Sequence, residues 1–187
     1  GFKFKNKAEL LMAMLHTGND SNKQKLLVGR GWAEFREDKT LDTSKWDAFI
    51  LRATNVTSGI LNESDYKFLQ EIWDLMDSLK PAAQKAHKQM YGYYFNEVTA
   101  NEFQTPWGNF RGGYVPAKVD VYEVEDAAIR NEREEFEKNN NSFQFPTTGR
   151  GFTKSRVEQY MKPLSLDMNL LGGHIDSVLR FSYIEPR

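Results

Sequence analysis

NESDYKFLQEIWDLMDSLK, residues 62–80, is the stretch that decides the fold class. Apolar side chains recur along it at spacings of three and four residues, at Tyr66, Leu69, Ile72, Trp73, Met76 and Leu79. That spacing places them on one face of an α-helix. The acidic side chains lie mostly on the other faces, at Glu63, Asp65, Glu71, Asp74 and Asp77. The stretch therefore predicts a long amphipathic helix whose apolar stripe packs in the core.

Helical spacing continues on both sides of this stretch. It covers residues 6–19, 22–29, 43–55, 82–95, 123–139 and 165–183. Because proline lacks the amide donor and clashes with the preceding turn, we expect Pro81 to stop or kink the central helix, with residues 82–95 continuing in a new direction. Gly172 and Gly173 lie inside the last segment and suggest a close neighbour there. The chain is predicted to be mainly α, with six to eight helices.

A stretch rich in glycine and proline, TPWGNFRGGYVPAKVD at residues 105–120, interrupts the helices. Strand-like residues flank the turn residues TPWGN, which predicts a small β-hairpin inserted around residues 98–120. Gly112 and Gly113 would permit a positive φ or the close approach of another backbone. Pro116 forces the residue before it to be extended. We interpret the stretch as a stiff connector that shapes the backbone.

Composition excludes several classes of function. The 25 Lys and Arg nearly balance the 26 Asp and Glu, giving a net charge of −1, so no overall field attracts nucleic acid or anionic lipid. Cysteine is absent, which removes disulfides, thiolate nucleophiles, iron–sulfur clusters and the usual structural zinc sites. The longest apolar runs fall far short of the roughly 20 residues that span a bilayer. We expect a soluble protein, and a first residue that is Gly suggests a fragment of a longer chain.

Candidate catalytic residues are few. His16, His87 and His174 are isolated in sequence and have no partner at metal-ligand spacing. Asp74 and Asp77 share a helix face, and two further carboxyl groups, on Glu97 and Glu102, flank the hairpin. A cell-wall glycosidase would need two such carboxyl groups about 5 to 9.5 Å apart in a cleft. Since nucleotide, hydrolase and calcium signatures are missing, we predict no catalysis, no metal and no cofactor, with the glycosidase kept as an alternative.

Arginine beside glycine and an aromatic residue offers a second alternative. GRGW at residues 29–32 and GRGF at residues 149–152 repeat this pattern, and residues 111–113 add RGG. Such arginines can stack on bases and contact phosphates of single-stranded nucleic acid. The candidate contacts are Arg30, Arg111, Arg150 and Arg156. The glycines also suit helix ends and loops, so nucleic-acid binding is not the favoured interpretation.

Several phrases of this sequence resemble one helical region of large polyvalent or internal virion proteins of bacteriophages and prophages. They are TGNDSNKQKLLVGRGW, DYKFLQEIWDLMDSLKP, TPWGNFRGGYVPAKVD, GFTKSR and PLSLDMNLLGGHIDSVLRF. The resemblance covers most of the chain, from about residue 6 to residue 183. Residues 33–60 and 121–148 carry no such phrase. The resemblance assigns no activity to this region, so no catalytic residue follows from it. It implies a place in the virion interior or the host cytoplasm, with other domains of the parent chain or other virion proteins as partners.

These observations combine into one expectation. Residues 1–187 form a single helical domain of a larger phage or prophage protein, with a polar segment at residues 139–156 as a long loop or arm. The domain is a non-catalytic structural or interaction module. Its structural signature is the set Trp73, Trp107, Gly112, Gly113, Tyr114 and Pro116. Trp107 and Tyr114 are expected to pack as aromatic side chains against the helical core.

Overall fold

The structure is a computed structural model that describes residues 1–118 and 163–182. The described residues are mainly helical, as predicted, with five helices and two small antiparallel hairpins. The predicted helix at 123–139, the predicted loop or arm at 139–156, and Arg150 and Arg156 lie outside the described residues.

The longest element is α4, Glu63–Tyr91. It begins with a capping box, in which the Asn62 side chain accepts the Asp65 amide and the Asp65 side chain accepts the Asn62 amide. Its predicted stripe is buried at Tyr66, Leu69, Trp73 and Met76, each at most 5% exposed. Of the two outcomes expected at Pro81, the stop is wrong, because one helix continues through Pro81 to Tyr91. Gly92 ends it at a φ of 82°, a left-handed conformation that glycine adopts without strain.

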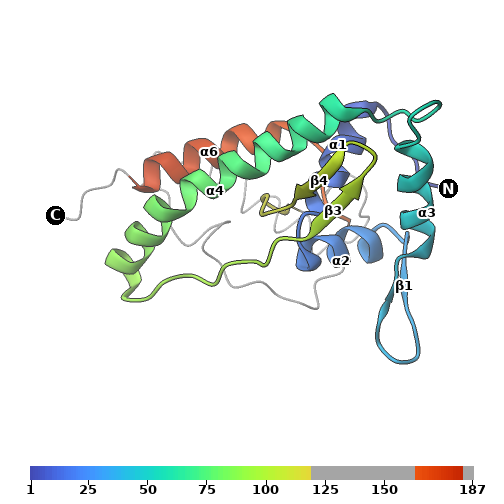
Figure 1. The fold of residues 1–187 in the computed structure, drawn as a ribbon. Helices are drawn as coiled ribbons and strands as arrows, with labels where there is room; N and C mark the ends of the chain where they lie inside the picture. Colours follow the sequence, from blue (N-terminus) through green and yellow to red (C-terminus); the bar gives the residue numbers. More distant parts are fainter. Residues whose placement is uncertain (119–162, 183–187) are drawn as a thin grey trace.

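Two helices form the N-terminal part of the core. They are α1, Lys7–His16, and α2, Asp20–Gly29, and each is capped by an asparagine side chain, from Asn6 and Asn19. Their apolar side chains belong to a cluster with the N-terminal half of α4, and Met12, Leu15, Leu26 and Leu27 are completely buried. Helix α1 crosses α4 beside the hairpin (Figure 1).

Helix α3, Ser44–Ala53, covers one end of this core. Before it stands a hairpin that the sequence did not predict, β1, Glu34–Phe35, paired with β2, Leu41–Asp42. The N-terminal segment packs here through an aromatic cluster in which Phe2 lies 5.3 Å from Trp32 and 5.4 Å from Trp46, measured between ring centroids. The two indoles stack on each other at 5.8 Å and 10°.

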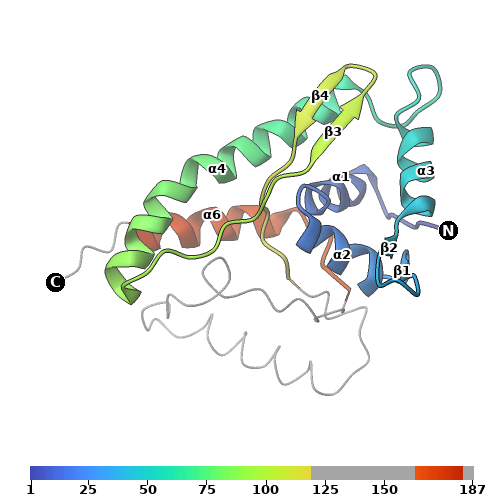
Figure 2. The same cartoon turned by 60° about the horizontal axis from the view of Figure 1, so that its bottom comes forward.

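The predicted central hairpin is present. Strand β3, Glu102–Thr105, pairs with β4, Gly108–Arg111, so the turn is made by Pro106 and Trp107. The chain then leaves β4 without further regular structure and crosses the core between α1, α2 and α4 (Figure 2).

Helix α6, Asn169–Ser182, lies along α4, and both helices end on the same side of the molecule (Figures 1 and 2). Leu171 and Val178 of α6 are buried. The expectation of a close neighbour at Gly172 and Gly173 is wrong for the described residues. Both glycines are exposed, and a β-carbon built on either would have none of the described atoms within 4 Å.

Candidate functional site

The signature glycines lie where two segments of backbone touch. A β-carbon added at Gly112 would lie 2.6 Å from the α-carbon of Gly18, in the turn between α1 and α2. One added at Gly18 would lie 2.7 Å from an indole carbon of Trp73 and 2.9 Å from the Gly113 nitrogen. Real β-carbons essentially never come this close to another heavy atom. Neither Gly112 nor Gly113 has a positive φ. Close approach of the Gly18 backbone is the reason for glycine at Gly112, whereas a β-carbon at Gly113 would make a tight contact of 3.3 Å with the Trp73 β-carbon.

The Trp73 side chain packs against the backbone of Gly18 and Gly113. It is 1% exposed, its indole N–H donates to the Leu15 carbonyl at 3.2 Å, and its ring stacks on Phe103 of β3 at 5.4 Å and 8°. A buried indole whose N–H has a partner contributes its full apolar area to the core. Trp73 thus joins α1, α4 and the hairpin.

Two asparagines hold the segment after β4. Asn19 donates its side-chain amide to the Gly113 carbonyl at 3.0 Å, and Asn22 donates to the Val115 carbonyl at 2.9 Å. Both asparagines are at most 1% exposed, and Val115 is completely buried. Sequence reasoning missed these contacts, because it placed Asn19 only at the end of the helical segment at residues 6–19.

The remaining signature residues also pack inward. The Trp107 ring lies 5.8 Å from Tyr66 and the Tyr114 ring 5.6 Å from His174, between centroids. Pro116 is buried. Residues 112–116 are therefore part of the core of the described structure, whereas Pro106, Gly108, Asn109 and Arg111 of the hairpin are exposed.

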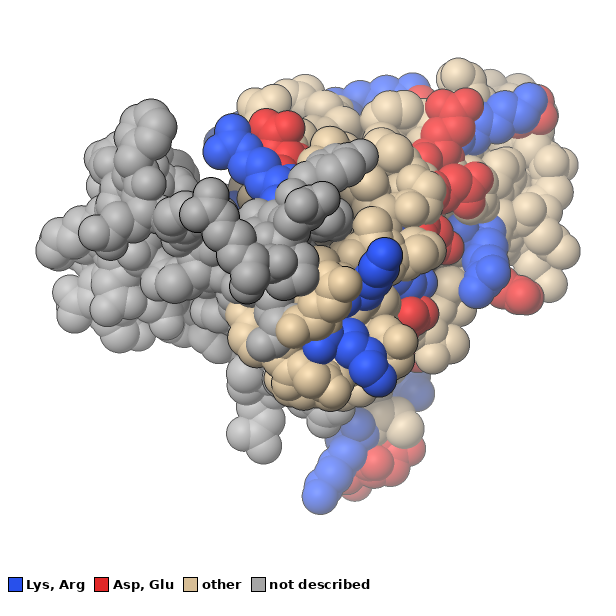
Figure 3. Space-filling view, turned by 90° about the vertical axis from the view of Figure 1, so that its left-hand side faces the viewer, with Lys and Arg blue, Asp and Glu red and all other residues tan. Residues whose placement is uncertain are grey.

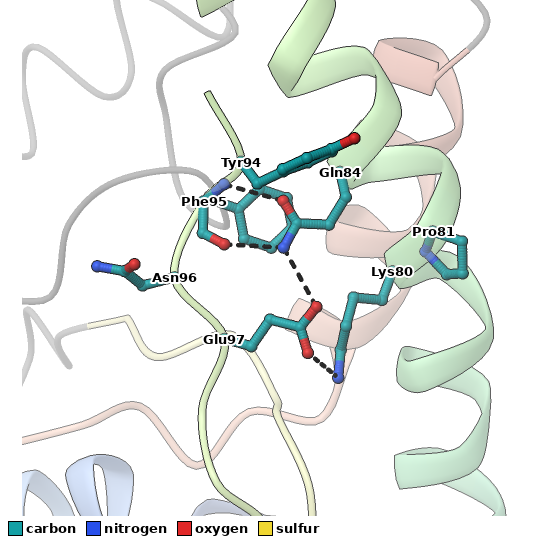
Figure 4. A pocket seen from close by; sticks show the side chains of 7 residues that line it. All are labelled: Lys80, Pro81, Gln84, Tyr94, Phe95, Asn96 and Glu97. Atoms are coloured by element: carbon teal, nitrogen blue, oxygen red, sulfur yellow. Dashed lines mark hydrogen bonds and ion pairs between the residues drawn. The ribbon is translucent and has the colours of Figure 1, made fainter. Parts of the chain in front are cut away.

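A shallow pocket of about 550 Å³ lies beside the C-terminal half of α4 (Figure 4). Its walls come from α4 and from the segment that follows Gly92, and they consist of Lys80, Pro81, Gln84, Tyr94, Phe95, Asn96 and Glu97. It contains one of the four carboxyl groups that the sequence singled out, Glu97.

Gln84 connects the two walls of this pocket. Its side-chain oxygen accepts the Phe95 amide at 2.9 Å, and its nitrogen donates to the Phe95 carbonyl at 2.8 Å and to Glu97 at 3.2 Å. One turn further on, the His87 ring nitrogen Nδ1 lies 2.8 Å from the Tyr93 carbonyl and donates to it. We call this set of contacts the Gln84 clamp. It occupies both polar atoms of the Gln84 side chain (Figure 4).

Lys80 brings two of the four carboxyl groups together. Its Nζ lies 3.0 Å from Asp77 Oδ1 and 3.2 Å from Glu97 Oε2. Burial lowers the pKa of Lys80, but the hydrogen bonds and charges of Asp77 and Glu97 outweigh it, so its pKa is raised. Asp74 instead accepts from Gln70 at 2.9 Å, and Glu102 lies on exposed β3. Asp77 and Glu97 are thus ion-paired to one ammonium group, with side chains 44% and 50% exposed.

The two described arginine candidates occupy different settings. Arg30, at the end of α2, donates to the Leu164 carbonyl through Nε at 3.2 Å and Nη2 at 2.7 Å, and its guanidinium lies 5.6 Å from the Trp32 ring centroid. Arg111 is exposed at the end of β4. The cations of α2 are also engaged, since Lys25 is buried and Lys23 lies 3.8 Å from Asp47. Arg30 therefore acts as a packing residue in the described structure.

The three histidines are all buried but lie apart. His16 Nε2 lies 3.4 Å from the Ser165 carbonyl, and His87 belongs to the Gln84 clamp. Burial, with the nearby positive charge of Lys118, lowers the pKa of His174 to about 4. Over residues 1–118 and 163–182, no three His, Asp or Glu side chains are grouped as a metal site.

The surface at which α4 and α6 end carries both signs of charge. On the described part of the face shown in Figure 3, Lys and Arg side chains lie among Asp and Glu side chains. A mixed surface of this kind does not steer a polyanion. None of the described helices is both long and apolar enough to cross a membrane.

Comparison with known proteins assigns neither a family nor a function to this chain. No protein-family model, curated protein or solved structure matches this chain. The functional interpretation therefore depends on the residues and contacts described above.

Proposed function

We propose that this chain is a non-catalytic structural or interaction module of a large phage virion-associated protein, of the kind packed in the capsid or ejected with the genome. The phage setting comes from the resemblance of QEIWDL, RGGYVP and PLSLD to a helical region of such proteins. Other domains of the parent chain or other virion proteins are then its partners, in the virion interior or the host cytoplasm.

The observation that best supports a structural role is the position of the RGGYVP residues in the fold. Gly112 and Gly113 pass against Gly18 and Trp73, and Val115 is completely buried. A binding loop would present its side chains to a ligand, whereas residues 112–116 are mostly buried and the Gly113 and Val115 carbonyls are bound by Asn19 and Asn22. The distinctive residues of the chain therefore serve its fold.

The glycosidase alternative is less well supported. Asp77 and Glu97 are close enough to share Lys80, as a carboxyl pair would need. A general acid, however, requires surroundings that keep its proton, such as an apolar pocket or a second carboxylate. Both carboxylates instead contact an ammonium group and are about half exposed.

The nucleic-acid alternative is also weaker. This alternative requires several arginines to lie together on one exposed face. Arg30 does not contribute to such a face, because its guanidinium donates to the Leu164 carbonyl. Arg111 is the other candidate within the described residues, and a single exposed arginine adds little to phosphate binding.

Quantitative peptide mass spectrometry on purified phage particles tests the proposal. Peptides from this chain should appear at a fixed ratio to the major capsid protein, and the ratio should persist through a second density gradient. An abundant host cytoplasmic enzyme serves as the control for contamination. If the peptides occur in infected or lysogenic cells and fall with the host enzyme during purification, the virion role is wrong, and intracellular nucleic-acid contact becomes the leading function.

A further inference from the structure

The segment after Gly92 runs extended beside α4 and pairs with no strand of the described structure. Both backbone groups of Phe95 bond to the Gln84 side chain, at 2.9 Å and 2.8 Å. This is the pattern of a hydrogen-bonded residue pair in an antiparallel ladder, with the carboxamide in place of a peptide group. The Tyr93 carbonyl points the same way, to His87. In Figure 1 the segment runs extended from the end of α4 toward β3.

The opposite edge of this segment is open. Along an extended chain, the backbone groups of successive residues point to opposite edges. Those of Tyr94 and Asn96 therefore face away from α4, and they make no hydrogen bond to any part of the chain that the structure describes. Both residues are exposed. An edge with free donors and acceptors is a template for pairing with another strand.

Exposed aromatic side chains surround the edge. Tyr91, Tyr93 and Tyr94 are 41%, 61% and 59% exposed, and the Lys88 ammonium lies 4.5 Å from the Tyr94 ring centroid. Tyrosine is enriched at protein interfaces because it combines apolar area with a polar tip. The edge therefore has apolar surface to bury as well as hydrogen bonds to form.

We propose that the edge formed by Tyr94 and Asn96 pairs antiparallel with the same edge of a second copy of this chain, giving a two-fold dimer centred on Phe95. In this register Tyr94 exchanges both backbone hydrogen bonds with Asn96 of the second copy, and Asn96 does so with Tyr94 of the second copy. Phe95 faces its own copy as a non-hydrogen-bonded pair. A two-fold interface uses one patch twice, which is what a single free edge provides.

Charge does not oppose a second copy as the partner. In the proposed register Glu97 lies opposite Tyr93 of the second copy, so the two Glu97 carboxylates do not face each other. Each Glu97 is already paired with Lys80 of its own chain at 3.2 Å. Like charges directly opposite one another would destabilise a pair of strands, and this register has none. The inference is independent of the phage setting proposed above.

The test compares two substitutions at one residue. Asn96→Pro removes the edge N–H, and the extended backbone that it requires at Phe95 is already present. Asn96→Ala removes the side chain and keeps the N–H. Molar mass is measured by analytical ultracentrifugation across a wide dilution series, with circular dichroism to verify folding. We expect the wild type and Asn96→Ala to dimerise alike, and Asn96→Pro to dimerise at least about tenfold more weakly, because each dimer loses two hydrogen bonds.

Each other result overturns the proposal. A wild type that stays monomeric, an Asn96→Pro variant that dimerises as well as the wild type, or an Asn96→Ala variant that is weakened as much as Asn96→Pro would exclude backbone pairing at this edge. If Asn96→Pro does not fold, amide hydrogen exchange on the wild type decides. The Tyr94 and Asn96 amides must then be protected in concentrated but not in dilute protein, and equal exchange at both concentrations would disprove the dimer.

Discussion

Gly112 passes so close to Gly18 that a methyl group added at Gly112 would lie 2.6 Å from the Gly18 α-carbon. The neighbour is backbone and cannot rotate away, so Gly112→Ala must push two segments apart. We expect a loss of about 1–3 kcal/mol in the free energy of unfolding, the usual cost of overpacking. Urea denaturation followed by circular dichroism measures it.

Gly172→Ala is the matched control and should act in the opposite direction. Gly172 lies inside α6 with none of the described atoms near its added β-carbon. Alanine in a helix interior is favoured over glycine by about 0.5–1 kcal/mol, so this variant should be more stable. A loss of stability in Gly172→Ala, or a gain in Gly112→Ala, would contradict the packing described here.

The Gln84 clamp can be tested on the same helix. Gln84→Ala removes the two bonds to Phe95 and should lower the free energy of unfolding by about 1–2 kcal/mol. Amide exchange at Phe95 should also become faster, because its N–H loses the Gln84 oxygen. Gln89→Ala, at an exposed position of α4, should change neither quantity. Equal effects of the two substitutions would show that residues 93–97 are not held by Gln84.

Pro81→Ala should stabilise the chain. Pro81 is exposed inside α4 and has no N–H to donate to the carbonyl four residues earlier. Restoring that donor should raise the free energy of unfolding by about 1–3 kcal/mol. Ala82→Gly, at the next exposed position, should lower it by about 1 kcal/mol if the helix is continuous here. An unchanged melting temperature in both variants would argue for a break at Pro81.

His174 predicts a dependence of stability on pH. Its pKa in the folded protein is lowered to about 4 from an ordinary value of 6.5, first by burial and then by the charge of Lys118. Between these values the unfolded chain binds a proton that the folded chain does not. Stability should therefore fall as the pH drops from about 6.5 to about 4, by up to about 3 kcal/mol.

Two variants test whether His174 causes this pH dependence of stability. His174→Gln should remove it, whatever it does to stability at neutral pH. Lys118→Gln should raise the pKa of His174 and reduce the dependence, since one of its causes is gone. The slope of the unfolding free energy between pH 4 and pH 6.5 is the measurement, and an unchanged slope in His174→Gln would refute the assignment.

Helices of this chain could be predicted because their periodicity is local. The stripe of Tyr66, Leu69 and Trp73 is visible in residues 62–80 alone, and these side chains are buried as the spacing requires. The central hairpin was predictable for the same reason, from turn residues between two strand-like runs. Hairpin β1–β2 was not, because two-residue strands show no alternation.

Contacts between distant segments could not be predicted. The sequence indicated either a positive φ or the close approach of another backbone at Gly112, and it did not indicate that this backbone belongs to Gly18. The sequence also predicted a close neighbour at Gly172, which has none among the described atoms. Gln84 looked like an ordinary surface residue, because its partner Phe95 comes close only after the turn at Gly92. Such pairings depend on the tertiary fold, which leaves no local pattern.

The described core is completed late during synthesis. Arg30 at the end of α2 bonds to the Leu164 carbonyl, His16 approaches the Ser165 carbonyl, and Leu164 and Leu166 are at most 4% exposed. A growing chain adds about 5–20 residues per second, so α1 and α2 wait on the order of ten seconds for these partners. During that interval the part of the core that Leu164 and Leu166 cover is accessible to chaperones, and a chain released early would be a natural substrate for proteases.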